Sequence, residues 1–250
     1  MKNYDPKTYW NTKAINAKGN YILASCGNNQ QENQCIHQVQ LHALNTVNNQ
    51  QIDIKDKTVL DFGCGSGRWV EFFCNKGANY TGVDISDEMI KLSKTRFPDL
   101  PFYTLKDHSI PLETDSCDFV FSIAVLHHNK PPSQEEILGE ISRVLKAGGY
   151  LFLFEGLGTT QHERLFPHPM QDWIKMVEQQ NFDCIMHQGY SSFALCNLMN
   201  NAARRLHIPR ASNWRPDLLL KLDARLSPAL SYRLSDEYHD RGAMLFKYRG

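Results

Sequence analysis

The sequence predicts an α/β fold, in which a mostly parallel β-sheet carries helices on both faces. Short apolar runs alternate with helical patterns through the middle of the chain, as is typical of such a sheet. Gly63, Gly65 and Gly67 follow the first run, at the point where a strand should pass into a helix. With 250 residues, the chain is long enough to bury the core of one domain. We therefore expect a single domain with a glycine turn at the edge of its sheet.

Short runs rich in β-branched and aromatic residues predict the strands of this sheet. Five lie in the first part of the chain and two near its end. The expected strands cover residues 58–62, 79–84, 102–105, 118–123, 150–155, 182–187 and 243–248.

The clearest helical pattern is expected to begin at Ser133, which can cap the helix together with Glu136. Apolar residues between positions 137 and 145 share one face of it, and Gly148 and Gly149 are expected to end it. Weaker patterns predict further helices at residues 37–44, from about residue 86, and at 170–180, 193–206 and 217–226.

More than fifty residues separate the last two expected strands, which is too long for a plain connection. We expect a substrate-facing helical insertion at about 191–240. Residues 1–45 are expected to form a lid segment and residues 46–250 the main domain. Within the lid, Tyr9 and Trp10 predict either the start of a helix that closes over a ligand or a hydrophobic staple onto the core.

Composition excludes several classes of protein. The formal net charge is zero, so nucleic acid is not an expected partner, although basic residues outnumber acidic ones after position 190. No apolar run approaches the ~18 residues of a membrane span, and the first ten residues lack the apolar core of a secretory signal. Seven cysteines without a CxxC pair favour reduced thiols in a cytoplasm over a disulfide framework or a zinc site, and no metal is expected.

The glycine turn predicts a ligand site, because bare backbone lets a ligand approach closely. A dinucleotide motif would need glycine at position 68 or 70, where the chain has Arg68 and Val70. Asp61 stands at the end of the strand before the turn, where a carboxylate suits a positively charged ligand. Asp84 ends the next strand, where an acid can accept hydrogen bonds from both hydroxyls of a ribose. Taken singly, such acids are often ordinary strand-end residues.

The runs VLDFGCGSG, GVDIS, DSCDFVFSIAVLHH and ISRVLKAGGYLFLFE occur in this order between residues 58 and 155. Together they resemble the class I S-adenosylmethionine-dependent methyltransferases. The resemblance implies a Rossmann-like, doubly wound, seven-stranded sheet whose last strand is antiparallel. It also implies S-adenosylmethionine as the cofactor and S-adenosylhomocysteine as the product.

The resemblance also assigns residues to the parts of the cofactor. Asp61 and the backbone of residues 63–67, with its three glycines, would hold the methionine part. Asp84, followed by Ile85, would hold the ribose.

Three further assignments concern the adenine and the ammonium group. Asp107 matches the acid that meets the adenine amino group, although it could equally be a plain turn residue. His108 would flank the adenine through its backbone. The fourth strand, near Ser122, would offer a carbonyl to the cofactor ammonium.

Paired histidines follow directly on the fourth strand, at the sheet edge where open α/β folds bind ligands. His127 or His128 is expected to act as a general base, with Glu155 at the end of the fifth strand as its support. Sugar O-methyltransferases of natural-product pathways have a similar arrangement. Alternatively, the histidine pair only caps the following segment.

We therefore expect O-methylation of a small molecule, such as a sugar or a natural-product intermediate. The insertion carries Arg204, Arg205, Arg210 and Arg215, which would suit an anionic acceptor, although such a cluster is often just a solvated face. The alternatives are an RNA methyltransferase that uses the basic insertion, and an inactive protein that binds the cofactor or a partner without catalysis.

Overall fold

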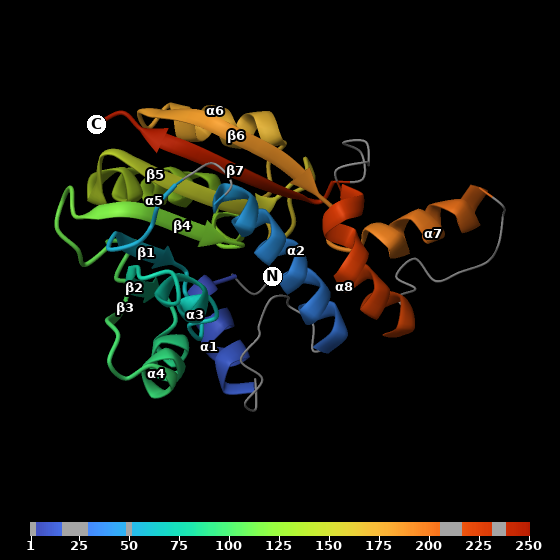
Figure 1. Cartoon of the computed structure of the whole chain (residues 1–250), viewed down its shortest axis with the longest axis horizontal. Helices are drawn as coiled ribbons and strands as arrows, with labels where there is room; N and C mark the ends of the chain where they lie inside the picture. Colours follow the sequence, from blue (N-terminus) through green and yellow to red (C-terminus); the bar gives the residue numbers. More distant parts are fainter. Residues whose placement is uncertain (1–3, 17–29, 49–51, 206–216, 232–238) are drawn as a thin grey trace.

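A seven-stranded sheet forms the centre of the molecule (Figure 1). The computed structural model describes residues 4–16, 30–48, 52–205, 217–231 and 239–250. The strand order is β3-β2-β1-β4-β5-β7-β6, and β7 runs antiparallel to both of its neighbours while the other pairs are parallel. The predicted fold class is thereby confirmed. The strands are β1 (Thr58–Phe62), β2 (Asn79–Asp84), β3 (Phe102–Thr104), β4 (Cys117–Ile123), β5 (Leu145–Gly156), β6 (Phe182–Tyr190) and β7 (Arg241–Tyr248).

Helices join the strands and precede the sheet. Within the described ranges, none of them combines the length and the apolar character needed to cross a membrane. The helices are α1 (Pro6–Asn16), α2 (Gln30–Asn48), α3 (Val70–Cys74), α4 (Asp87–Arg96), the short 3-10 turn η1 (Leu126–His128), α5 (Pro131–Val144), α6 (Met170–Glu178), α7 (Ala194–Arg205) and α8 (Asp217–Ser231).

Two hydrophobic cores lie on opposite faces of the sheet, because successive strand residues point to opposite sides. In β1, Val59 packs with α2 and α3, whereas Leu60 and Phe62 pack with α5 and α6. The same alternation continues in β4, where Phe119 belongs to the first core and Val120 to the second. Figure 1 shows these helices on the two sides of the sheet.

Helix α5 differs from its prediction at both ends. It begins at Pro131, two residues before Ser133, because two prolines supply the fixed φ that suits a first helical turn. It ends at Val144, and Leu145 already starts β5. Gly148 and Gly149 therefore lie within the strand and do not end the helix.

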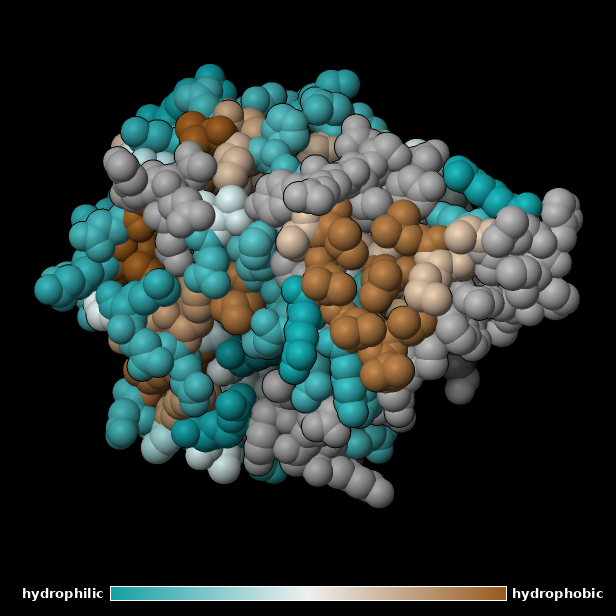
Figure 2. Space-filling view, turned by 45° about the vertical axis from the view of Figure 1, so that its right-hand side comes forward, coloured by the Kyte–Doolittle hydropathy of each residue, from teal (hydrophilic) through white to brown (hydrophobic). Residues whose placement is uncertain are grey.

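The predicted insertion between the last two strands is present as α7 and α8. Helix α8 lies beside α2 (Figure 1), and Ile36 of α2 shares a small apolar core with Cys196 of α7 and Leu220 of α8. The outer side of α8 exposes three leucines, and Figure 2 shows an apolar patch over this helical part of the molecule. The exposed leucines are Leu218, Leu222 and Leu226.

Candidate active site

A cavity of about 330 Å³ opens at the carboxyl edge of the sheet. Its wall combines the ends of β1, β2 and β4 with residues from α1, α2 and the start of β7. We call one side the glycine end, formed by Asp61, Gly63, Gly65 and Asp84, and the other the imidazole end, formed by His127, His128, Leu165 and Arg241.

The turn after β1 needs its glycines for two different reasons. Gly63 has φ +80°, and a Cβ there would stand 2.2 Å from Val125 Cγ2. Its backbone N–H donates to the Val83 carbonyl at 2.8 Å, which ties the turn to β2. Gly65 has φ +53°, and a Cβ there would meet no atom within 4 Å, because the position faces the cavity. The first glycine thus permits close packing, and the second leaves room for a ligand.

Two buried carboxylates border this turn. Asp61 accepts a hydrogen bond of 2.5 Å from the Tyr80 hydroxyl, and burial raises the pKa of Asp61 to about 7. Asp84 accepts hydrogen bonds from the backbone N–H groups of Gly65 (2.9 Å) and Ser86 (2.8 Å), and burial raises its pKa to about 6. Both acids therefore become ionised more readily once a ligand supplies a positive charge or hydrogen-bond donors.

An apolar wall continues from Asp84 along the cavity. The predicted residues Ile85 and His108 line it, together with Met89 and Leu105. This surface suits a flat, uncharged ring.

Three of the predicted cofactor residues do not line the cavity. Asp107 is exposed and has φ +47°. Gly67 (φ +74°) packs against Phe97 behind the turn. The side chain of Ser122 is fully buried, and its hydroxyl makes no hydrogen bond within the described part of the chain. At this strand the wall is formed by the residues that follow it, Ile123, Ala124 and Val125.

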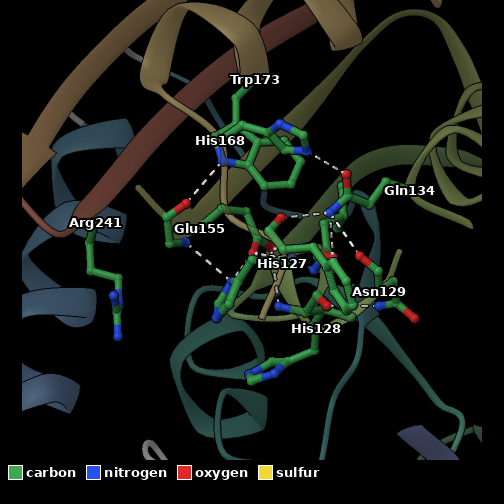
Figure 3. A network of polar contacts seen from close by, with 12 residues as sticks. His127, His128, Asn129, Gln134, Glu155, His168, Trp173 and Arg241 are labelled. Carbon is green, nitrogen blue, oxygen red and sulfur yellow. Dashed lines mark hydrogen bonds and ion pairs between the residues drawn. The ribbon is translucent and has the colours of Figure 1, made fainter. Parts of the chain in front are cut away.

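At the imidazole end, Glu155 organises the turn that carries the histidines. Its buried carboxylate accepts hydrogen bonds from the backbone N–H groups of Val125 (3.2 Å), Leu126 (3.1 Å) and His127 (3.1 Å). Glu155 Oε2 also lies 2.5 Å from His127 Nδ1 (Figure 3).

The hydrogen bonds of Nδ1 decide which form of the His127 ring is present. Gly156 N–H approaches Nδ1 at 3.1 Å, but the contact with the Glu155 carboxylate is shorter and charge-assisted. With Glu155 as a carboxylate, which can only accept, Nδ1 carries the proton and donates a hydrogen bond to Glu155. Nε2 is left with a lone pair, on a ring that lines the cavity.

His128 has a different environment. Its Nδ1 donates to the Arg164 carbonyl at 3.2 Å, and its ring lies 4.4 Å from that of His127 and 5.3 Å from that of Trp10, centroid to centroid. Burial, reinforced by the neighbouring His127, lowers the pKa of His128 to about 3. His128 is therefore a neutral hydrogen-bonding group and a weak base.

Gln134 of α5 holds the same turn from the other side (Figure 3). Its Nε2 lies within 3.1 Å of the carbonyl oxygens of Leu126, Asn129 and Phe166, and its Oε1 lies 2.8 Å from His168 Nε2. The turn is thus fixed between a strand and a helix.

The comparisons with known proteins agree with this geometry. Residues 60–153 match the family profile described as "Methyltransferase domain". A ubiquinone biosynthesis O-methyltransferase from Nitrosomonas europaea is 25% identical over 159 residues, which cover 55% of this chain and 67% of that protein. The phosphoethanolamine N-methyltransferase 2 of Haemonchus contortus, solved with S-adenosyl-L-methionine, superposes with a TM-score of 0.59 at 16% identity, over 84% of this chain and 53% of that chain. These similarities support a class I S-adenosylmethionine-dependent methyltransferase, with the methyltransferase domain itself matched at residues 60–153.

Some relatives are considerably longer than the matched region. The phthiotriol/phenolphthiotriol dimycocerosates methyltransferase of Mycobacterium tuberculosis is 34% identical over 104 residues, which cover 40% of this chain and 38% of that protein. The matched region is thus less than half of either protein.

The cavity of this methyltransferase fits its cofactor, S-adenosylmethionine. The buried carboxylate of Asp61 would hold the ammonium group, Asp84 the ribose hydroxyls, and the wall around Leu105 the adenine. The backbone of Gly65 leaves the space that the chain of the methionine part requires.

Sequence reasoning missed several residues of the methyltransferase cavity. Gln40, Arg68, Trp69 and Arg241 all line it. In the sequence, Arg68 served only to exclude a dinucleotide motif, Trp69 received no ligand role, and no local pattern marked Gln40 or Arg241. Arg68 and Trp69 follow the glycine turn directly, whereas Gln40 enters the cavity from α2 and Arg241 from the distant strand β7.

Proposed function

We propose that this methyltransferase transfers a methyl group to a hydroxyl of a small molecule, with His127 as the general base. One observation carries the proposal: His127 Nδ1 is bound to the buried Glu155, on a ring that lines the cavity. S-adenosylmethionine supplies a methyl group on a positively charged sulfur. Nε2 of His127 takes the hydroxyl proton as the oxygen attacks, and Glu155 stabilises the imidazolium that forms.

His128 acts as a positioning residue in this proposal. Its neutral ring accepts a hydrogen bond at Nε2, since Nδ1 is already bound to the Arg164 carbonyl. A base with so low a pKa is a poor proton acceptor at neutral pH. The sequence left both histidines open as the base, and the hydrogen bonds favour His127.

One curated relative supports transfer to oxygen of a small molecule. The Nitrosomonas europaea protein is named an O-methyltransferase of ubiquinone biosynthesis, and the Mycobacterium tuberculosis protein acts on phthiotriol and phenolphthiotriol dimycocerosates. We carry over only the class, a small molecule with a hydroxyl group.

An acidic group on the acceptor is favoured by Arg241. This residue lines the cavity and pairs with Gly156 across β5 and β7, and Gly156 in turn packs against the His127 ring. Figure 3 shows the Arg241 side chain to one side of His127. A carboxylate or phosphate on the acceptor would thus be held near the base.

The predicted arginine cluster is not part of this site as described. Arg205 is exposed at the end of α7. Arg210 and Arg215 lie outside the described residues, as does the side chain of Arg204. We therefore transfer the proposed anion recognition from the insertion to Arg241.

Helix α1 is proposed as the lid over the cavity. Pro6 and Trp10 line the cavity, and Asn11 Oδ1 accepts hydrogen bonds from Ser86 Oγ (2.7 Å) and Glu88 N (3.3 Å) at the start of α4. Helix α2 runs to Asn48, three residues beyond the predicted end of the lid segment at residue 45. We keep the division into lid (1–45) and domain (46–250) as a proposal, with α2 contributing to both.

A cytoplasmic location also remains a proposal. No disulfide joins the described cysteines, which fits a reducing compartment.

Tritium transfer from methyl-labelled S-adenosylmethionine into a cell extract tests the proposed reaction. The expected product is a small-molecule methyl ether, identified by mass spectrometry, and incorporation is unchanged after ribonuclease treatment. His127→Ala should lower the rate about 10²- to 10⁴-fold, with affinity for S-adenosylhomocysteine within threefold of the parent, whereas His128→Ala should lower it less. Methylated RNA would support the alternative enzyme, and binding of the cofactor without any transfer would support the inactive protein.

Arg241 is tested with the acceptor found in that screen. Arg241→Gln should raise KM at least tenfold for an acidic acceptor, and Arg241→Lys should raise it less. Arg205→Gln is the matched control, because this arginine belongs to the predicted cluster and is exposed on α7. An acceptor without an acidic group, or equal effects of the two Gln variants, contradicts the role of Arg241.

A further inference from the structure

Arg68 is a cation on the cavity wall next to the glycine turn. Its guanidinium lies over the Trp69 ring, 4.5 Å from the ring centroid. Its Nη1 donates to Gln40 Oε1 at 2.6 Å and lies 3.4 Å from His37 Nδ1. Arg68, Trp69 and Gln40 all line the cavity. The turn after β1 and one face of α2 thus meet at the Arg68 guanidinium.

The same cluster contains two buried N–H donors that could each donate a hydrogen bond to an oxygen of a ligand. Gln40 Nε2 and Trp69 Nε1 are buried, and neither has a hydrogen-bond partner in the described part of the chain. Gln40 is 1% exposed and Trp69 3% exposed, so bulk water does not satisfy them. Buried donors without acceptors are costly and therefore uncommon in folded proteins.

Asp61 stands close to this cluster. Burial raises the pKa of Asp61 to about 7 although the charge of Arg68 acts to lower it, and burial lowers the pKa of Arg68 to about 10 although the charge of Asp61 acts to raise it. An acid and a base side by side on one wall are complementary to a zwitterion. The ammonium and carboxylate groups of one amino acid are such a pair, held on a single carbon.

We propose that Arg68, Gln40 and Trp69 form the binding site for the carboxylate of the cofactor's amino-acid part, next to Asp61, which binds its ammonium group. The guanidinium provides the charge and Gln40 Oε1 holds its orientation. This inference rests on the S-adenosylmethionine site but is independent of the proposed acceptor and base.

The site gives α2 a direct role in cofactor binding. Gln40 lies on the face of α2 that meets the cavity, while Cys35 and Ile36 pack with Phe193 and Leu220 of the insertion. A bound carboxylate would therefore fasten α2 to the glycine turn.

Three adenosyl ligands separate the parts of this interaction. S-adenosylhomocysteine has both charged groups, its decarboxylated amine analogue has only the ammonium, and 5′-methylthioadenosine has neither. Isothermal titration calorimetry with the parent protein should give affinities that fall in this order. Loss of the carboxylate should weaken binding about 10- to 100-fold, the usual effect of one charged hydrogen-bonded pair.

The decisive variant is Arg68→Met, which keeps much of the side-chain length without the charge. It should weaken S-adenosylhomocysteine about 10- to 100-fold and change the decarboxylated analogue less than threefold. Gln40→Glu should also weaken S-adenosylhomocysteine more than the decarboxylated analogue, because the introduced carboxylate would pair with the Arg68 guanidinium in place of the ligand. Arg96→Met is the matched control: Arg96 Nη1 donates to the Ser66 carbonyl at 2.6 Å, but Arg96 is not part of the cavity wall.

The outcomes are separable. If the parent protein binds none of the three ligands, the cofactor site itself is wrong. If it binds them but Arg68→Met weakens all three equally, while thermal unfolding shows a folded protein, Arg68 supports the structure and the proposal is overturned. Equal affinity of the parent for the acid and the amine overturns it as well.

Discussion

The two ends of the cavity are built in different ways. The glycine end consists of one tight turn and two strand ends, and its main contacts are made by backbone, as in the hydrogen bond from Gly65 N–H to Asp84. The imidazole end is assembled from distant segments, since Trp10, His127 and Arg241 come from α1, η1 and β7. The first is therefore a local structure that could serve any acceptor, and the second depends on tertiary packing that can vary with the acceptor.

Replacing Glu155 tests the imidazole end most severely. Glu155→Ala would leave three backbone N–H groups of the histidine turn without their acceptor. We expect the free energy of unfolding to fall by about 3–5 kcal/mol, because each buried donor left without an acceptor costs about 1–3 kcal/mol. Urea denaturation measures the loss.

The matched variant for this prediction is Glu155→Gln, which retains an acceptor oxygen and should lose less than Glu155→Ala. If both variants unfold like the parent, the acid does not hold the turn.

The glycine end is tested by a pair of substitutions. Gly63→Ala would force a methyl group against Val125 in a left-handed conformation, so we expect a loss of about 2–4 kcal/mol in the free energy of unfolding. Gly65→Ala meets open space and should cost only about 1 kcal/mol, yet it should weaken S-adenosylhomocysteine by filling the cavity.

Denaturation in the absence of ligand and calorimetry with it separate these two effects. The opposite pattern, with Gly65→Ala the less stable and Gly63→Ala the weaker binder, would contradict the distinction between packing and ligand space.

The acidity of the solution should act mainly on the glycine end. The pKa of folded Asp61 is about 7, above its ordinary value of 3.8. The ligand-free folded state therefore holds this proton more tightly than the unfolded state, and its stability falls as the pH rises from about 4 to 7. Affinity for S-adenosylhomocysteine should change in the opposite direction, because the ammonium prefers the ionised acid.

Calorimetry between pH 5.5 and 8 measures this change. Affinity should rise by up to tenfold per pH unit below pH 7 and then level off. Asp61→Asn should flatten this dependence, leaving the smaller contribution of Asp84, whose pKa is about 6. A parent profile as flat as that of the variant would exclude Asp61 as the titrating group.

The smallest effect is expected where α1 closes over the cavity. Asn11→Ala removes the acceptor for Ser86 Oγ and Glu88 N, which should cost about 1 kcal/mol and speed hydrogen exchange throughout α1. Thr12→Ala is the control, because the Thr12 hydroxyl donates to the Thr8 carbonyl within the same helix, on its exposed side. Equal exchange in the two variants would mean that Asn11 does not fasten the lid.

Most of the sheet was predictable because its signals are local. Strands β1 and β2 have the predicted bounds, and the helix after β2 begins where Ser86 Oγ accepts the Met89 N–H. The predicted start of α5 was wrong. Ser133 resembles a helix cap, but the helix begins two residues earlier, at two prolines. Strand β5 begins five residues earlier than expected, because Leu145 already pairs with Cys117 of β4, and a β-bulge lies between this pair and the pairing of Tyr150 with Phe119.

The site residues that could be predicted are those marked by their own position in the sequence. Asp61 and Asp84 could be singled out because each ends a strand, and both line the cavity. Gln40 and Arg241 could not, because no local pattern says which residue of a long helix or a distant strand will reach the sheet edge. The proposal of His127 rather than His128 as the general base rests on the hydrogen bonds of their Nδ1 atoms. The sequence does not show these bonds, because the two histidines are adjacent in it.

Helix α2 belongs to both halves of the molecule, since it contacts the glycine turn through Gln40 and the insertion through Ile36. Chimeric enzymes that exchange only the segment between β6 and β7 would therefore pack helices from another protein against the native α2, which contacts the cofactor site. Grafts that also carry residues 30–48 should retain cofactor affinity better than grafts without them. For the engineer, the natural unit of exchange in this protein is discontinuous in sequence.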